Sequence, residues 1–317
     1  MNIVFLGSSQ FAVPALSRII SSSHKVICVV TQPDRLSGRG LSLSCTEVKR
    51  LSEKHKLRIY QPDNINKQES VEFLKKLDAD ISVVVAFGQI LSKSILAIPK
   101  IISLNLHASL LPKYRGAAPI RQAIINGERQ TGLTIIKLVE ELDAGPIILQ
   151  KRIDIEDYDN AISLEEKLSD LGGNLIIQAL DLIRDKKHSL VIQNEKEASY
   201  APKLKKEDGL INWDKSARSI SNLIRGCAGW PGAYTHYRDK ILKIHKVSLV
   251  SPCLKNDPSV IPPGRIMQVS KQGIVVATGD GSLLIEELQM PGKKKMAVCE
   301  FIPGYIISVG ESLGKKN

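Results

Sequence analysis

Cysteines and long apolar runs are scarce in this chain of 317 residues. Its five cysteines are Cys28, Cys45, Cys227, Cys253 and Cys299. They are odd in number, lie far apart and form no CxxC pair, so the sequence indicates neither a disulfide framework nor a zinc site. No apolar run is long enough to span a bilayer, and MNIVFLGSSQ lacks the basic region and cleavage site of a signal peptide. We therefore expect a cytoplasmic protein with reduced thiols and no membrane contact.

Aromatic and acidic residues are also few. Aromatic residues make up 4% of the chain, and 44 Lys+Arg against 33 Asp+Glu leave a net charge of +11 and a pI near 9.3. A basic excess of this size attracts polyanions over long distances, although a soluble protein can also be basic without a nucleic-acid partner. If nucleic acid binds, the scarcity of aromatic side chains argues against base stacking as the main mode.

The glycine-rich dinucleotide-binding motif GxGxxG is missing from the first turn, which reads LGSSQFA. That motif brings the backbone close to a pyrophosphate, so its absence disfavours a nicotinamide-dependent dehydrogenase. We assign no functional role to Ser8 or Ser9 in this turn.

Length and patterning together predict two domains. Residues 1–187 alternate short β-branched runs, such as NIVFLG, VICVVTQ and ISVVVAFG, with amphipathic helical segments. Strands that are apolar on both faces and separated by helices are typical of a parallel sheet covered on each side. A long helix through SLEEKLSDLGGNLIIQALDLIRDKK closes this α/β domain.

Residues 188–207 carry several charges and a proline without a sustained apolar period, which is typical of a linker. Residues 208–317 contain INWDKSARSISNLIRG, predicted as a helix, which is followed by short strands separated by turns. This pattern favours a small antiparallel barrel or sandwich. With 15 Lys+Arg and 9 Asp+Glu, the second domain has a net charge of 15 − 9 = +6.

Polar side chains at strand ends are the first candidates for a site, because ligands of open parallel sheets bind beyond the carboxyl ends of the strands. Asn105 and His107 lie two positions apart in SLNLHAS and should therefore point to the same face. Asp143, in LDAGPI after the strand TGLTIIKLV, could reach the same edge. Arg115 and Gly116 follow in a Gly- and Pro-rich segment that we expect to form a loop against a ligand.

The same three residues also fit a purely structural interpretation. His107 could be hydrogen-bonded at a strand end, Asp143 could begin a turn before Gly145, and Asn105 could satisfy backbone groups. Spacing alone favours the structural interpretation, because short signals from a single sequence are weak.

Several segments occur together in the order and near the spacing of one enzyme family. They are FAVPAL, TQPDR followed by GRG, the Asn-Leu-His strand, SLLPKYRGAAPI, LDAG, YAPKL, INW, WPGAY and VATGDG. The chain thereby resembles the methionyl-tRNA formyltransferases over nearly its whole length; SLLPKYRGAAPI is very specific, whereas TGDG alone would identify nothing. The resemblance implies a Rossmann-like formyltransferase domain (1–187), a linker (188–207) and an OB-like barrel domain that binds tRNA (208–317).

The resemblance also implies an activity: transfer of a formyl group from 10-formyltetrahydrofolate to the amino group of methionyl initiator tRNA, which yields N-formylmethionyl-tRNA for translation initiation. No metal is implied, and we expect a monomer. The family's catalytic triad falls on Asn105, His107 and Asp143. Its folate-contacting stretch falls on Ser109, Leu110, Leu111 and Pro112.

The chemistry gives each triad member a hypothetical role. An unperturbed α-amino group has a pKa of about 8, so part of it is already a free nucleophile at neutral pH. The attack creates an oxyanion, for which we expect Asn105 and His107 to be the hydrogen-bond donors, each worth about 3 kcal/mol when preorganised. Asp143 would orient His107 and relay the proton lost by the ammonium.

For tRNA, the resemblance implies that the exposed loop PDRLSGRGLSL enters the end of the acceptor stem. Arg39 between two glycines is the main candidate contact and Arg35 the second. Many family members carry lysines after this Gly-Arg-Gly, whereas Leu41 and Ser42 follow here. The alternative is a solvated loop with incidental arginines.

Lysine runs form a further candidate surface for phosphates. They comprise Lys203, Lys205 and Lys206 in the linker and Lys293, Lys294 and Lys295 near the end of the chain. Such runs are often only solvated, but in a basic domain they suit contacts to an RNA backbone that do not depend on sequence.

Two other functions remain open at this point. Formyltransferases that act on nucleotide sugars or purine precursors share the triad, so the triad identifies the reaction more securely than the acceptor. A non-enzymatic tRNA-binding protein on a degenerate scaffold is disfavoured by the intact Asn105, His107 and Asp143.

Overall fold

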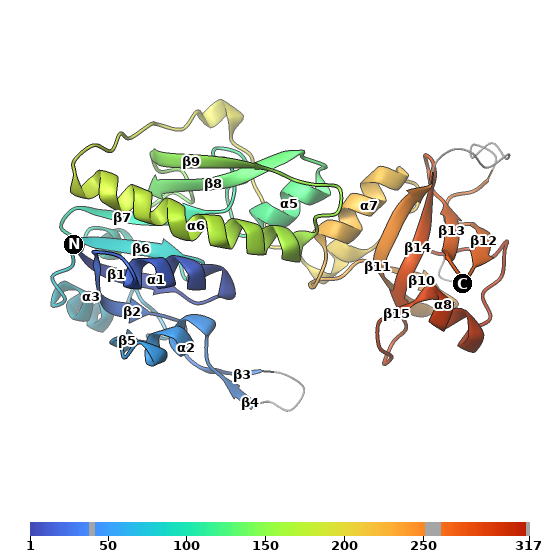
Figure 1. Cartoon of the computed structure of the whole chain (residues 1–317), viewed down its shortest axis with the longest axis horizontal. Helices are drawn as coiled ribbons and strands as arrows, with labels where there is room; N and C mark the ends of the chain where they lie inside the picture. Colours follow the sequence, from blue (N-terminus) through green and yellow to red (C-terminus); the bar gives the residue numbers. More distant parts are fainter. Residues whose placement is uncertain (38–41, 251–260, 315–317) are drawn as a thin grey trace. The chain divides into compact units, whose positions relative to one another are not determined.

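The computed structural model describes residues 1–37, 42–250 and 261–314, which form two compact units (Figure 1). Unit 1 comprises Met1–Pro119, Gln130–Asp154 and Glu165–Ala201, and unit 2 comprises Ile120–Arg129, Ile155–Leu164 and Pro202–Asn317. The predicted linker is divided between them, because residues 188–201 belong to unit 1 and residues 202–207 to unit 2.

Unit 1 is built on a seven-stranded sheet in the order β5-β2-β1-β6-β7-β8-β9. Its strands are β1 (Asn2–Gly7), β2 (Lys25–Val30), β5 (Ile59–Tyr60), β6 (Ile81–Val85), β7 (Ile102–His107), β8 (Gln130–Lys137) and β9 (Ile147–Asp154). The five strands from β5 to β7 are parallel, and β8 and β9 are antiparallel to their neighbours. The interior strands are buried along most of their length, as expected for a sheet covered on both faces.

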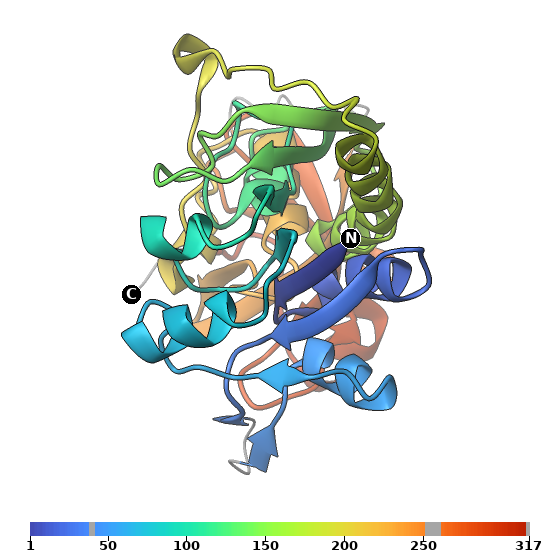
Figure 2. The same ribbon diagram turned by 90° about the vertical axis from the view of Figure 1, so that its left-hand side faces the viewer.

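Helices cover the sheet on both sides (Figure 2). α1 (Val13–Ile20) and α6 (Ala161–Arg184) lie on one side, while α3 (Gln68–Lys75) and α4 (Lys93–Leu96) pack on the other against a cluster that includes Val4 and Leu6. α2 is Glu47–Lys54. A Cβ at Gly172 would lie 2.6 Å from Leu106 Cδ2, so the missing side chain lets α6 approach β7 closely.

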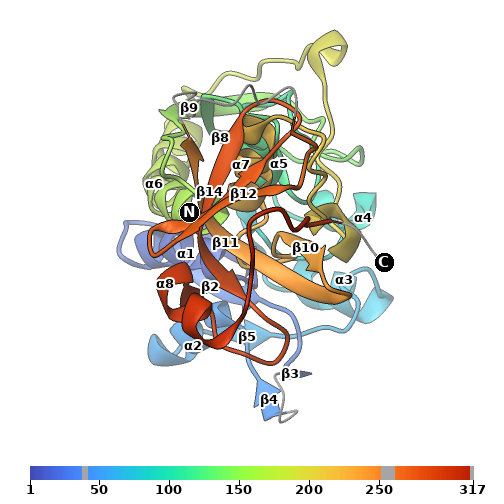
Figure 3. The same ribbon diagram turned by 90° about the vertical axis from the view of Figure 1, so that its right-hand side faces the viewer.

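Unit 2 contains an antiparallel sheet with the path β10-β11-β14-β13-β12, and β15 pairs with β14 (Figure 3). Its strands are β10 (Tyr234–Tyr237), β11 (Lys240–Val250), β12 (Ile266–Ser270), β13 (Gly273–Ala277), β14 (Ser282–Gln289) and β15 (Met296–Ala297). Its helices include α5 (Pro119–Ile125), which begins one residue before unit 2, α7 (Ala217–Gly226) and α8 (Val298–Phe301). The prediction of a parallel-rich α/β unit followed by a smaller antiparallel β unit is confirmed.

Two local predictions were wrong. The segment expected to be a loop includes a hairpin of β3 (Arg35–Ser37) and β4 (Ser42–Ser44), in which Leu36 faces Leu43. The predicted helix from INW onward begins only at Ala217, because the Ser216 hydroxyl accepts a hydrogen bond from Ser219 N and caps the helix there.

No helix in the described ranges is both long and apolar enough to cross a bilayer.

Candidate active site

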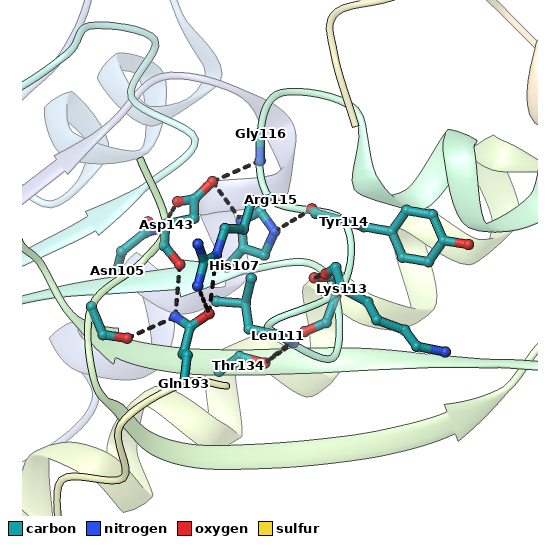
Figure 4. Close-up of polar contacts among 12 residues, drawn as sticks. Asn105, His107, Leu111, Lys113, Tyr114, Arg115, Gly116, Thr134, Asp143 and Gln193 are labelled. Carbon is teal, nitrogen blue, oxygen red and sulfur yellow. Dashed lines mark hydrogen bonds and ion pairs between the residues drawn. The ribbon is translucent and has the colours of Figure 1, made fainter. Parts of the chain in front are cut away.

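Three polar side chains meet at the end of β7 (Figure 4). Asn105 and His107 project from β7, and Asp143 comes from the turn between β8 and β9. Asn105 Nδ2 donates to Asp143 Oδ1 over 3.3 Å, and His107 Nδ1 lies 3.5 Å from Asp143 Oδ2. The period-two alternation of a strand explains why Asn105 and His107 face the same carboxylate.

The backbone completes the surroundings of Asp143. Gly116 N donates a hydrogen bond of 2.8 Å to Asp143 Oδ2. His107 and Asp143 are buried, with 5% and 8% of their surface exposed, whereas Asn105 is partly exposed. The site therefore opens to solvent on its Asn105 side.

One nitrogen of the His107 ring, Nε2, is occupied by a hydrogen bond to the protein backbone. Nε2 lies 2.9 Å from the carbonyl oxygen of Tyr114, which can only accept a hydrogen bond, so Nε2 carries a proton. Nδ1 is the nitrogen that faces Asp143 and the only one left to act on a ligand. The predicted role of His107 as an oxyanion donor therefore has a condition. Because Nε2 already donates to Tyr114 O, His107 can donate to an oxyanion only when Nδ1 is protonated as well.

Two residues that contact His107 adopt a rare backbone conformation. Tyr114 has φ 62° and Asp143 has φ 51°, both in the left-handed region that favours glycine. Such conformations cost on the order of 1–3 kcal/mol each and persist only where neighbouring groups hold them. The partners that hold Asp143 are therefore part of the site.

The predicted folate stretch, Ser109 to Pro112, forms a tightly bonded turn. Ser109 is buried and its hydroxyl donates to Lys113 O over 2.6 Å. Thr134 Oγ1 donates to Ser109 O and accepts from Leu111 N, at 2.7 and 3.1 Å. Thr134 thus bridges Ser109 and Leu111 and holds the turn, a role that the sequence pattern did not reveal.

Apolar side chains with exposed surface lie on the segments that follow β6, β7 and β8. Leu110 and Pro112 are partly exposed. Leu142, directly before Asp143, is 60% exposed, and Ile90, in the loop after β6, is 81% exposed. The sequence does not single out Leu142 and Ile90, because exposure rather than residue type distinguishes them from core residues.

Arg115 lies in the loop that was expected to form against a ligand, and its side chain is buried. Arg115 is 2% exposed, and its guanidinium donates to Gln193 Oε1 and to both carboxylate oxygens of Glu195. The hydrogen bond with Glu195 raises the pKa of Arg115 and lowers the pKa of Glu195. Nothing local signals this pairing, because Gln193 lies 78 residues further along the chain in the predicted linker.

The predicted RNA contacts that the structure describes are exposed. Arg35 is exposed on β3 and donates to Gln32 Oε1 over 3.2 Å. Lys203, Lys205 and Lys206 are exposed in unit 2. Arg39 lies outside the described residues.

Within the part of the chain that the structure describes, no group of three or more His, Cys, Asp or Glu side chains could hold a metal ion.

Comparisons with known proteins match both units. Residues 1–180 match the family model described as formyl transferase, and residues 203–305 match the one described as formyl transferase, C-terminal domain. The chain is 45% identical to a protein of Clostridioides difficile named methionyl-tRNA formyltransferase, over 99% of this chain and 100% of that one. A protein of the same name from Geobacter metallireducens is 44% identical over 99% of both chains.

A solved structure shares the fold. The N-formyltransferase from Helicobacter canadensis, in complex with folinic acid and dTDP-3-aminofucose, has a TM-score of 0.66 and 19% identity. The match covers 93% of this chain and 99% of that one.

The His107 geometry predicts a single neutral tautomer. In ¹⁵N-histidine NMR of the labelled protein, Nε2 of the neutral His107 ring should have the chemical shift of a protonated nitrogen and Nδ1 that of an unprotonated one, because the Tyr114 carbonyl requires a donor. His55, which is exposed, serves as a solvated reference in the same spectrum. A neutral ring protonated at Nδ1 would contradict the geometry.

Proposed function

This chain belongs to the methionyl-tRNA formyltransferase family, enzymes that transfer a formyl group from 10-formyltetrahydrofolate to the amino group of initiator methionyl-tRNA, and we propose that Asn105, His107 and Asp143 carry out this transfer here. The chain is accordingly a formyltransferase with 10-formyltetrahydrofolate as its cosubstrate. The observation that carries the residue assignment is the convergence of an amide, an imidazole and a carboxylate on one edge of the sheet.

The reaction defines what these groups must do. The methionyl nitrogen attacks the formyl carbon, a carbon–nitrogen bond forms, and the carbonyl oxygen becomes an oxyanion. The bond from this carbon to N10 of the folate then breaks. The methionyl nitrogen loses one proton and N10 gains one. A single group that accepts the first proton and then donates it to N10 therefore completes the reaction.

The three side chains divide this work. Asn105 Nδ2 has two N–H groups and gives one to Asp143, so the other is free to donate to the oxyanion. His107 Nδ1, beside the Asp143 carboxylate, takes up the proton of the attacking amine. Once protonated, Nδ1 is the donor that stabilises the oxyanion and then returns the proton to N10, while the Asp143 carboxylate balances the imidazolium charge.

The folate pteridine binds beside the turn of residues 109–112 in this proposal. Ser109 and Leu111 fix the turn, and Leu110 and Pro112 supply apolar surface. The exposed side chains of Ile90 and Leu142 add apolar surface of the kind that lines sites for flat ring systems.

The tRNA backbone binds to basic side chains outside the triad. Arg35 on β3 and the exposed Lys203, Lys205 and Lys206 of unit 2 are the proposed contacts among the described residues, with Arg39 as a further one on sequence grounds. The net charge of +11 supports an electrostatic contribution to RNA affinity. We place the reaction in the cytoplasm, where charged tRNA enters translation, and assign it to the monomer, because all three triad residues come from one chain.

Acceptor choice is tested by direct competition. The protein is incubated with 10-formyltetrahydrofolate and charged initiator tRNA, charged elongator methionine tRNA or an amino-sugar nucleotide, and formyl incorporation is followed. We expect a clear preference for initiator methionyl-tRNA. A preference for the amino-sugar nucleotide would overturn the acceptor assignment while leaving the triad chemistry in place.

The role of Asp143 is tested by Asp143→Asn, which keeps the shape and removes the charge. We expect kcat to fall by about 10²-fold or more, because proton transfer at His107 loses the carboxylate that balances the imidazolium charge, with the folate KM changed by less than about threefold. Asp63→Asn, on an exposed residue of unit 1, is the matched control. An Asp143→Asn variant that turns over like the parent would refute the assignment.

The lysine contacts are tested by the salt dependence of tRNA binding. Replacing Lys203, Lys205 and Lys206 together by alanine should lower the slope of log K against log salt by about 0.7–0.9 for each phosphate that no longer has a lysine partner. The control is the triple alanine variant of three exposed lysines at the opposite sheet edge from the triad. Lys54 and Lys75 are the last residues of α2 and α3, and Lys76 follows Lys75. Equal slopes in the two variants would exclude the proposed contacts.

A further inference from the structure

Gln193 connects the catalytic turn to a buried arginine. It lies in the irregular segment after α6 and is 6% exposed. Its Nε2 donates to the backbone oxygens of Asp143 and Gly145, each at 2.7 Å. Its Oε1 accepts from Arg115 Nε and Nη2, at 3.1 and 2.8 Å (Figure 4).

This hydrogen bonding uses the whole amide. A glutamine side chain offers two N–H donors and two acceptor lone pairs, and all four are satisfied at Gln193. Reversing the amide would turn its oxygen towards two carbonyl oxygens and its NH₂ group towards a guanidinium. The amide therefore fits in one orientation, and neither Glu nor an apolar side chain can reproduce it.

The carbonyl that Gln193 holds belongs to a strained residue. Asp143 has φ 51°, and the direction of its carbonyl group reflects this backbone conformation. The same residue carries the carboxylate that faces His107 Nδ1 at 3.5 Å. If the carbonyl were released, the backbone could relax towards an ordinary conformation and the carboxylate would move.

The segment that contains Gln193 also holds the other side of the site. Arg115 N donates to Ser199 O over 2.8 Å, Ala201 N donates to Arg115 O over 2.7 Å, and Tyr114 N donates to Ser199 Oγ over 2.9 Å. Gly116 has φ 119°, and a Cβ there would lie 2.7 Å from Ala201 O, so only glycine fits against this segment. The segment thereby aligns the Tyr114 oxygen with His107 and the Gly116 nitrogen with Asp143.

We propose that Gln193 is a positioning residue for formyl transfer. It touches neither substrate; through the Asp143 and Gly145 carbonyls it fixes the Asp143 carboxylate against His107 Nδ1, and Arg115, held by Glu195, fixes Gln193 in turn. In this proposal the segment predicted as a linker, residues 188–207, helps to position the catalytic residues. This inference rests on the proposed catalytic role of Asp143.

Two substitutions distinguish the role of the Gln193 NH₂ group from that of its oxygen. Gln193→Met removes all four hydrogen bonds at similar length. Gln193→Glu keeps an acceptor for Arg115 but loses both donors to the backbone carbonyls. We expect each to lower kcat about 10- to 100-fold, because a displacement of about 1 Å in a catalytic group costs up to 10²-fold, while the KM values for folate and tRNA change by less than about threefold. Gln193→Glu with parental kcat would show that only the arginine contact matters and would overturn the proposal.

A double-mutant cycle tests whether the effect passes through Asp143. In the Asp143→Asn background, Gln193→Met should lower kcat by less than about twofold further, because the charge that it positions is already gone. If Gln193→Met lowers kcat in that background by the same factor as in the parent, Gln193 acts independently of the carboxylate and the proposal fails. Gln178→Met, on an exposed position of α6, is the matched control and should behave like the parent.

A readout without turnover separates this inference from the proposed function. The ¹⁵N chemical shift of His107 Nδ1 reports on the neighbouring carboxylate, and we expect it to move in Gln193→Met and Gln193→Glu but not in Gln178→Met. If the parent transfers no formyl group, the function fails and this shift still tests the geometry. If the parent is active and the shift stays unchanged in both Gln193 variants, only the positioning role is refuted. Thermal unfolding verifies that each variant is folded, and Gln193→Glu alone carries the test if Gln193→Met does not fold.

Discussion

The site depends on keeping one buried carboxylate charged and in place. A carboxylate removed from water is costly unless donors replace its hydration, and Asp143 obtains them from Asn105 Nδ2 and Gly116 N. Each donor is supplied by a different element, β7 or the loop that follows it. The position of the carboxylate is therefore only as precise as the packing of these elements against each other.

At His107 a backbone carbonyl determines which ring nitrogen is available for proton transfer. The Tyr114 carbonyl accepts a hydrogen bond from Nε2–H and leaves Nδ1 beside Asp143, so a main-chain oxygen seven residues away decides which nitrogen can exchange a proton. That oxygen is presented by a residue in the left-handed region, and the loop that carries it is held by Ser199 and Ala201. The cost of the conformation is offset by these hydrogen bonds.

Much of the fold could be predicted because its signals are local. Apolar β-branched runs such as ISVVVAFG are buried strands whatever their neighbours, and β6 occupies that run. The hairpin of β3 and β4 was missed because its polar, glycine-rich sequence resembles a loop and its strands form a separate two-stranded sheet. The start of α7 was missed because a serine cap, rather than the apolar pattern, decides where that helix begins.

The sequence by itself determined which chemical groups reach the end of β7, because strand alternation puts Asn105 and His107 on one face and the turn after β8 supplies Asp143. Only the tertiary structure decided how they are held. The sequence predicted that the loop of Arg115 lies against a ligand, but not that Arg115 is buried against Gln193, which in turn holds the Asp143 carbonyl from 50 residues away. Hydrogen bonds between segments so distant in the chain leave no local pattern, since each depends on where the backbone places both partners.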